Sequence, residues 1–520
     1  MIQLLDTTLR DGAQGYGISF SKQDKLRIIK LLDKLGIDII EAGNPAASIS
    51  DAELLAKSIP LSHARLAAFG STRHKDTTPL TDPSLNAILN TAAPVAVIFG
   101  KCSPSASVQV IRTTPEENLN MIFQSVEYLT KNGKTVIFDA EHFFTSYDED
   151  PDYALKALLA AQSAGAQSVC LCDTCGGTLP DRAAEVVREV CKSLSIPVGI
   201  HAHDDSGLAT ALSLAAVKAG ATSVQGTLSG IGERCGNANL STIIPNLVLK
   251  MGKKCLGGDL SQLTRTTRAV AEICNISLPG SLPFVGKNAF AHKAGMHVDA
   301  LSKQKGSYEH VDPEIVGNSR KILLSEYSGR VSVSKKLEGL DPELAKDEEL
   351  ARELTAAVKQ MEHDGFRFEG ADASFELLAL RTKGLLKNYF TLDLFKVMEE
   401  QPFLGASTNA SAMVKITVSG QSEISAAEGS GPVDALDKAM RKALLVFYPA
   451  IGSMHLSDFK VRVLDSSFAT GASVRVMIES SDGVSFWSTV GASTDIIEAS
   501  TIALVDSMMY KLYKDEKCNM

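Results

Sequence analysis

Two histidines separated by one residue, His201 and His203, are the best candidates for chemistry in this sequence. They end the apolar run 197–203, which predicts a β-strand, and residues two apart on a strand point to the same face, with Ile200 and Ala202 on the other. Two imidazoles on one face, with oxygen ligands from other strands, suit a divalent transition metal. An open coordination position on such an ion lets a substrate bind directly.

Oxygen donors for this site can come from two other places in the chain. Asp11 follows the apolar run 2–6 and is our candidate carboxylate ligand, and Asn237, in a glycine-rich loop, offers an amide oxygen. Arg10 presents a fixed positive fork to a substrate carboxylate or a developing oxyanion. Two alternatives stay open, because Arg10 could form an internal ion pair with an aspartate, and an Asn in such a loop often serves the turn.

Glu141 and a group of cysteines are further candidates. Glu141 ends the apolar run 135–141, so partial burial could raise its pKa and suit it to acid or base work, or it could pair with a neighbouring Lys or Arg. Cys170, Cys172 and Cys175 are close enough to suggest a metal site, but no matching second cluster accompanies them. We favour packing in and after a buried strand.

Repeated βα units must position these residues. The first 250 residues alternate short apolar runs with amphipathic stretches, a pattern typical of a parallel sheet. The runs that predict strands are 2–6, 37–43, 64–70, 93–100, 135–141, 168–174, 197–203 and 222–228. Eight strands in about 230 residues, each followed by a helix, predict a closed (β/α)8 TIM barrel with its reacting groups at the C-terminal face. An open doubly wound sheet is disfavoured, because no GxGxxG follows the first strand.

The rest of the chain shows two further patterns. From about residue 275 it is rich in His, Lys and Gly and then predicts charged helices over 333–390, a connecting region of small, mainly helical subdomains. From about 396, strand-like segments precede a helix and the order recurs, which predicts a C-terminal α+β domain with two β-then-α repeats. The predicted domains are therefore residues 1–275, 276–395 and 396–520.

Composition narrows the class of protein. A chain of 520 residues with 44% hydrophobic and 22% charged residues is typical of a globular protein with more than one domain. A formal net charge of −9 gives no broad field to attract nucleic acid or an anionic membrane. The nine cysteines suit reduced thiols, and no stretch is a secretory leader or a membrane span. We expect a cytoplasmic protein with no nucleic-acid or membrane partner.

Four segments carry a family resemblance. They read DTTLRDGAQ at 6–14, HAHDD at 201–205, GERCGNAN at 232–239 and HKAGMHVDA at 292–300. The chain resembles, over nearly its whole length, the TIM-barrel acyltransferases that include isopropylmalate, homocitrate and citramalate synthases. The resemblance implies a divalent metal ion, Mn, Mg or Zn, with acetyl-CoA as co-substrate. The metal ligands that it implies are Asp11, His201, His203 and Asn237.

The resemblance also implies roles for other residues. Arg10 holds a 2-oxo acid and stabilises the forming alkoxide, while Gln14 and Thr174 contact this substrate. The implied catalytic residues are Arg10, Glu141, His297 and Tyr308. Glu141 lies near the reacting acetyl group, and His297 and Tyr308 assist its deprotonation or transfer. In the family the connecting region covers the active site of the partner subunit, so a homodimer is implied.

Within the family, the segments 67–73, 138–144 and 171–180 are most similar to the citramalate-forming members. This implies an enzyme that condenses acetyl-CoA with pyruvate to (R)-citramalate and free CoA, on the route to isoleucine. Residues 41–51 read EAGNPAASISD, where those members have a Gly-Gly-Trp-Pro pattern. An isopropylmalate synthase acting on 2-oxoisovalerate therefore stays open, as does a metal-dependent barrel aldolase or carboxytransferase.

The C-terminal module resembles the family's allosteric domain. Its implied ligand is the end-product amino acid, with isoleucine the best candidate. The helix starts at 428–435 and 490–499 offer backbone N–H groups to the effector carboxylate, or are simply well-capped helices.

Overall fold

The computed structural model describes residues 1–520 except 294, 305, 323–329, 401–408, 465–471, 484 and 519–520. It contains two compact units. The first comprises residues 1–290 and 309–319, and the second comprises 291–308 and 320–520. The HKAGMHVDA segment falls in the second unit, and its Ala294 lies outside the described residues.

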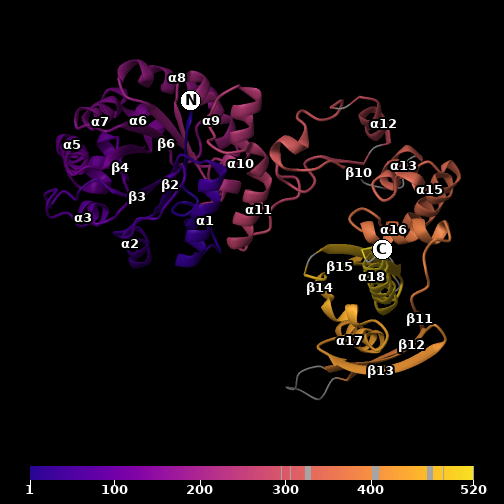
Figure 1. Ribbon diagram of the computed structural model, residues 1–520. Coiled ribbons are helices and arrows are strands. Elements are labelled where there is room, and N and C mark those ends of the chain that lie inside the picture. The colour runs from indigo at the N-terminus through magenta and orange to yellow at the C-terminus, as the bar shows by residue number, and fades with distance from the viewer. Residues whose placement is uncertain are drawn as a thin grey trace. The chain divides into compact units, whose positions relative to one another are not determined.

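The first unit is built on eight parallel strands that close into a barrel in sequence order, and Figure 1 shows helices arranged around them. The predicted TIM barrel is confirmed, and every predicted strand overlaps an observed one. The strands are β1 Gln3–Asp6, β2 Ile39–Gly43, β3 Arg65–Ser71, β4 Val95–Lys101, β5 Thr135–Glu141, β6 Ser168–Asp173, β7 Val198–Ala202 and β8 Ser223–Gly226.

Helices of the first unit lie between successive strands or follow the last strand. They are α1 Lys22–Leu35, α2 Ile49–Leu55, α3 Pro83–Leu89, α4 Pro104–Ala106, α5 Pro115–Lys131, α6 Phe143–Glu149, α7 Pro151–Ser163, α8 Pro180–Ser193, α9 Ala209–Ala219, α10 Leu240–Pro245 and α11 Leu263–Ile273. Helix α1 shows how the sequence sets their ends. Ser21 and Asp24 form a reciprocal capping box at its start, and Gly36 ends it with a left-handed φ of 89°.

The alternation along each strand divides the side chains between two cores. Leu4 of β1 and Ile200 of β7 point outward into the core between strands and helices, where both are fully buried. Leu5 belongs instead to a small cluster of strand residues that fills the barrel interior, together with Val97 and Ile137. Apolar side chains therefore pack the interior below the C-terminal face.

The second unit begins with helices and a short parallel strand pair. Its first elements are β9 Ala291–His292, α12 Gly295–Lys303, β10 Lys321–Ile322, α13 Arg330–Glu338, α14 Pro342–Ala345, α15 Glu348–His363 and α16 Asp372–Thr382. Val333, Leu354 and Phe375 form part of a core shared by α13, α15 and α16. The predicted charged helices over 333–390 are thus observed, with their apolar faces buried together.

Two β-then-α repeats follow, as predicted. The first is β11 Thr391–Glu400, β12 Asn409–Val418, β13 Gln421–Gly429 and α17 Pro432–Leu445. The second is β14 His455–Val463, β15 Val474–Ser481, β16 Phe486–Ser493 and α18 Ile496–Cys518. Each sheet is three-stranded and antiparallel, and the helices α17 and α18 contribute to one common core.

The strand β11 was not among the predicted strands. A register shift between Leu392 and Leu394 interrupts its alternation, so its inward residues are Leu392, Phe395 and Val397 rather than every second one. A bulge of this kind hides the period of two on which strand prediction depends.

Candidate active site

Three predicted metal ligands converge at the C-terminal face of the barrel. The Nε2 atoms of His201 and His203 lie 3.4 Å apart. Oδ2 of Asp11 lies 3.4 Å from Nε2 of His201 and 3.9 Å from Nε2 of His203. All three side chains are buried. His201 in β7 and His203 directly after it both lie on the face opposite Ile200, as the alternation predicts. One carboxylate and two imidazoles thus point at a common position.

Unpartnered buried oxygens show that these residues fit a cation. Among the described residues, Oδ1 of Asp11 and Oδ1 of Asn237 are buried without a hydrogen-bond partner. Asn237 forms an isolated bridge with His203, and its Nδ2 donates to the Ile231 carbonyl at 3.3 Å, which leaves its Oδ1 unused. A buried polar atom without a partner costs about 1–3 kcal/mol. Both oxygens are free to bind a cation, and two imidazoles with oxygen donors form a set that suits a divalent metal ion.

The charges around the triad favour the metal-binding form of two of its three members. Burial raises the pKa of Asp11, but Arg10 and His201 outweigh burial and hold that pKa well below its usual range. Burial and the charge of His201 lower the pKa of His203 to about 4, so its imidazole is neutral at pH 7. Burial lowers the pKa of His201, but its hydrogen bond to Asp11 and that carboxylate's charge outweigh burial and raise it. An anionic Asp11 beside a neutral His203 is the state that a cation requires.

Arg10 is fixed from three sides. Its Nε donates to Oε2 of Glu41 at 2.6 Å, its NH1 lies 3.5 Å from Oδ2 of Asp11, and its guanidinium sits 3.8 Å from the ring centre of Phe69. Burial lowers the pKa of Arg10, but the charges of Glu41 and Asp11 outweigh burial and raise it. The internal ion pair considered above therefore exists, and its main partner is a glutamate of β2 that the sequence did not single out.

Most of the other predicted site residues line one cavity with this triad. The cavity has a volume of about 230 Å3 and opens at the C-terminal face. Besides the three ligand candidates, its walls include Arg10, Gln14, Glu141 and Thr174. The rings of Phe69 and Phe99, stacked with centroids 5.5 Å apart, form an apolar wall that the sequence did not predict. A small polar molecule with one apolar group would fit these surroundings.

Glu141 forms an ion pair with Lys101, which ends the neighbouring strand β4. This is the pairing with a nearby Lys that the sequence left open, and Lys101 was not itself predicted. Glu141 remains on the cavity wall, about one quarter exposed at 23%. Its carboxylate can therefore reach a bound molecule while it is held by a cation.

Two of the candidate cysteines form a buried cluster with Asp139. Asp139, Cys170 and Cys172 lie within 4.8 Å of one another and are buried. Burial raises the pKa of the Cys170 thiol well above its ordinary value. The hydrogen bond with Cys170 lowers the pKa of Cys172, but burial and the charge of Asp139 outweigh it and raise this pKa to about 11. Without a bound cation, both groups are therefore protonated thiols at neutral pH, which agrees with the packing role that we favoured for them. Cys175 is exposed, with its Sγ 3.6 Å from Nδ1 of His142.

His297 and Tyr308 lie together within the second unit. Their rings are stacked, with centroids 3.9 Å apart and an interplanar angle of 18°. The phenol is half-exposed at 49%. The chain thus brings these two predicted residues together with each other, although they are separate in sequence.

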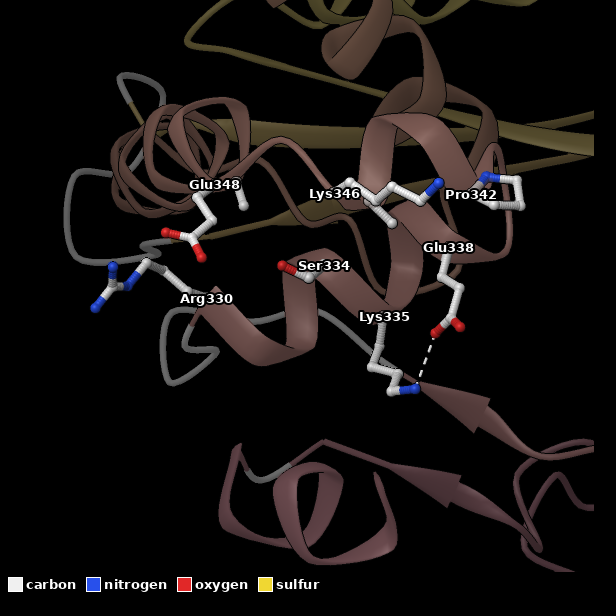
Figure 2. A pocket seen from close by; sticks show the side chains of 9 residues that line it. Arg330, Ser334, Lys335, Glu338, Pro342, Lys346 and Glu348 are labelled. Atoms are coloured by element: carbon white, nitrogen blue, oxygen red, sulfur yellow. Dashed lines mark hydrogen bonds and ion pairs between the residues drawn. The ribbon is translucent and has the colours of Figure 1, made fainter. Parts of the chain in front are cut away.

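A larger cavity of about 600 Å3 lies among α13, α14 and α15 (Figure 2). Its walls carry charged side chains such as Arg330, Lys335 and Glu338, and Lys335 donates to Glu338 at 2.8 Å. Exposed ion pairs of this kind contribute little to stability. None of the lining side chains is among the buried, unpartnered polar groups of the described residues. Among the described residues, this cavity therefore lacks the unpartnered buried oxygens that Asp11 and Asn237 provide in the barrel.

No described helix combines the length and the apolar character that a membrane span needs.

Three family models together match most of the chain. The HMGL-like model matches residues 1–270, the homocitrate synthase post-HMGL domain-like model matches 284–365, and the LeuA allosteric (dimerisation) domain matches 369–512. These matches correspond in order to the barrel, the helices that follow it and the two β-then-α repeats.

Curated relatives match along nearly the full length. The "(R)-citramalate synthase" of Aquifex aeolicus is 46% identical and that of Geobacter sulfurreducens is 45% identical, each match covering 99% of this chain and 98% of the relative. A "Probable 2-isopropylmalate synthase" of Methanosarcina acetivorans is more distant, at 31% identity, with 99% and 96% covered. The chain therefore belongs to the (R)-citramalate synthase family, whose barrel is of the HMGL-like type.

Proposed function

We propose that the protein condenses acetyl-CoA with pyruvate to give (R)-citramalate and free CoA, a step towards isoleucine. The observation that carries the proposal is the meeting of Asp11, His201 and His203 in the cavity that also holds Arg10 and Thr174. The name shared by the relatives at 45–46% identity supports pyruvate as the oxo acid.

The proposed metal ligands are Asp11, His201, His203 and Asn237. A bound Mn, Mg or Zn ion would supply positive charge that polarises the keto group and stabilises the alkoxide formed from it. The unpartnered Oδ1 atoms of Asp11 and Asn237 support this assignment.

The other side chains of the cavity would bind and orient pyruvate. Arg10, kept charged and immobile by Glu41, would bind the oxo acid without reorganisation during the reaction. The Thr174 hydroxyl accepts a hydrogen bond from the His142 backbone at 2.8 Å, so its own proton is directed elsewhere and can be donated to the substrate carboxylate. Gln14 offers an amide on the same wall.

The carbon–carbon bond requires loss of a proton from the acetyl methyl group. A base built around His297, Tyr308 or Glu141 would remove this proton, and the resulting enolate would attack the keto carbon of pyruvate. The new alkoxide takes up a proton, and water then cleaves the thioester to release CoA. The stacking of His297 on Tyr308 and the position of Glu141 on the cavity wall support these candidates.

We also propose how the chain is divided, assembled and regulated. Residues 1–275 would form the catalytic barrel, 276–395 would complete the active site of a partner in a homodimer, and 396–520 would bind an amino-acid effector, with isoleucine the best candidate. The LeuA allosteric (dimerisation) match over 369–512 supports the last two assignments. Every cysteine whose side chain the structure describes is free, as suits a cytoplasmic enzyme.

A thiol-release assay on the full chain tests the reaction. Acetyl-CoA is supplied with pyruvate, 2-oxoisovalerate or 2-oxoglutarate, with Mn or Mg, and with or without isoleucine or leucine. We expect release to be fastest with pyruvate and to stop with a chelator. Faster release with 2-oxoisovalerate would replace the proposal with an isopropylmalate synthase. Cleavage of citramalate without any thiol release would replace it with a lyase.

A further inference from the structure

A buried chain of hydrogen bonds runs from His201 across the barrel interior. Nδ1 of His201 lies 3.1 Å from Oε1 of Gln225, which is on β8. Nε2 of Gln225 donates to Oδ1 of Asp139 at 2.8 Å, and Asp139 is on β5. The exposed fractions of the three residues are only 5%, 1% and 4%. Water therefore offers none of these groups an alternative partner.

When Asp139 is ionised, the donors and acceptors in this series of hydrogen bonds permit one arrangement. An ionised carboxylate only accepts hydrogen bonds, so the amide of Gln225 must turn its NH2 group towards Asp139. Its carbonyl oxygen then faces His201, and Nδ1 must carry the proton, because a lone pair there would oppose a second acceptor at 3.1 Å. A neutral imidazole protonated at Nδ1 has its lone pair on Nε2, the atom that faces Asp11 and His203.

In the described part of the chain, His203 has no hydrogen bond at Nδ1 corresponding to the one between His201 and Gln225. Nδ1 of His203 is buried without a hydrogen-bond partner among the described residues. Nδ1 of His203 therefore has no hydrogen bond from a described residue that would set its ring or tautomer from the side away from the triad, whereas Gln225 contacts Nδ1 of His201. Hydrogen bonds of this kind to a metal-binding histidine commonly change metal affinity about 10–100-fold.

We propose that Gln225, held in turn by Asp139, is a positioning residue that presents Nε2 of His201 to the metal ion. The inference rests on the proposed function only in taking Asp11, His201 and His203 as metal ligands. Neither Gln225 nor Asp139 is given a reacting role by it.

Metal affinity of the full-length protein measures this effect without reference to turnover. The protein is stripped of metal, and its affinity for Mn2+ is followed by electron paramagnetic resonance. The pH is kept at 8, above the pKa of Asp139, which burial and the charge of Glu41 raise to about 7. Thermal unfolding without metal shows whether each variant is folded.

Three variants give a graded expectation. Gln225→Met keeps the length of the side chain but neither hydrogen bond, and should bind Mn2+ about 10–100-fold more weakly. Asp139→Ala leaves the side-chain amide of Gln225 free to exchange the positions of its oxygen and nitrogen, and should weaken Mn2+ binding less than Gln225→Met does. Asp139→Asn keeps an oxygen that can accept from Gln225 and should restore most of the affinity. If Gln225→Met fails to fold, the comparison of the two Asp139 variants still decides the question.

Two controls separate this inference from general damage and from the proposed function. Ile137→Val trims a residue of the barrel interior on the same strand as Asp139 and should bind Mn2+ as the wild type does. Wild-type affinity in Gln225→Met, or an equal loss in Ile137→Val, overturns the inference. If His203→Ala also binds Mn2+ normally, the proposed metal site itself is wrong; if only His203→Ala loses affinity, the site stands and the role of Gln225 does not.

Discussion

His203 is the ligand candidate whose loss should disturb the fold least. It is buried, but its Nδ1 has no partner among the described residues, so truncation breaks no hydrogen bond there. We predict that His203→Ala abolishes thiol release from acetyl-CoA and pyruvate while the circular dichroism spectrum and thermal midpoint stay near those of the wild type. His455→Ala, on the exposed start of β14, is the matched control and should retain activity. Unchanged thiol release in His203→Ala would contradict the assignment.

The spacing of residues in the sequence predicted some members of the site but not others. His201 and His203 were recognisable because they are two apart at a strand end, and Asp11 because it closely follows the first strand. Glu41 and Gln225 gave no such signal: Glu41 is 31 residues from Arg10, and Gln225 is 86 residues from Asp139. Their contacts arise only when the barrel closes, and a single polar residue in a strand pattern does not indicate its partner.

At the scale of elements, the strands were predictable because eight apolar runs occur at regular intervals, and their order in the barrel follows from the handedness of βα units. The loops between them were less predictable. Arg234 has a left-handed φ of 55° and donates to both oxygens of Asp205 and to the Thr174 carbonyl, each at 2.8 Å. It thus joins the loops after β6, β7 and β8 and holds the segment that carries Asn237. No local pattern indicates this connection.

Asp6, at the end of β1, makes the stability of the fold depend on pH. Asp6 is fully buried, and burial raises its pKa from 3.8 to about 7, against the opposing effect of hydrogen bonds from Thr8. The pKa of Asp6 is higher in the folded protein than in the unfolded chain, so protonated Asp6 favours the folded state. This contribution to the free energy of unfolding is fully present below pH 4 and is lost as the pH rises through 7.

We therefore predict that Asp6→Asn flattens this dependence. The free energy of unfolding, measured by urea denaturation at intervals from pH 4 to pH 8, should fall less steeply with pH in the variant than in the wild type. The slopes are compared, because the substitution also alters the hydrogen bonds to Thr8 and so changes stability at every pH. Parallel slopes would show that Asp6 is already ionised in the folded protein at low pH.

At the scale of the whole molecule, the candidate groups are divided between two units. Asp11, His201, His203 and Glu141 belong to the first, and the His297–Tyr308 pair belongs to the second. If both groups act in one reaction, the two units must meet either within one chain or between chains of a dimer. The family model over 369–512 is described as a dimerisation domain, so a dimer is the assembly in which to test the second arrangement.

Mixing two inactive variants distinguishes these arrangements. We predict that His203→Ala and His297→Ala are each inactive, but that unfolding and refolding them together restores about a quarter of wild-type thiol release. Half of the randomly paired dimers would be mixed, and each mixed dimer would have one intact site of two, built from the unaltered barrel of one chain and the unaltered second unit of the other. A wild-type sample carried through the same refolding sets the reference. If the site were complete within each chain, every site in the mixture would contain one of the substitutions, and no activity would return.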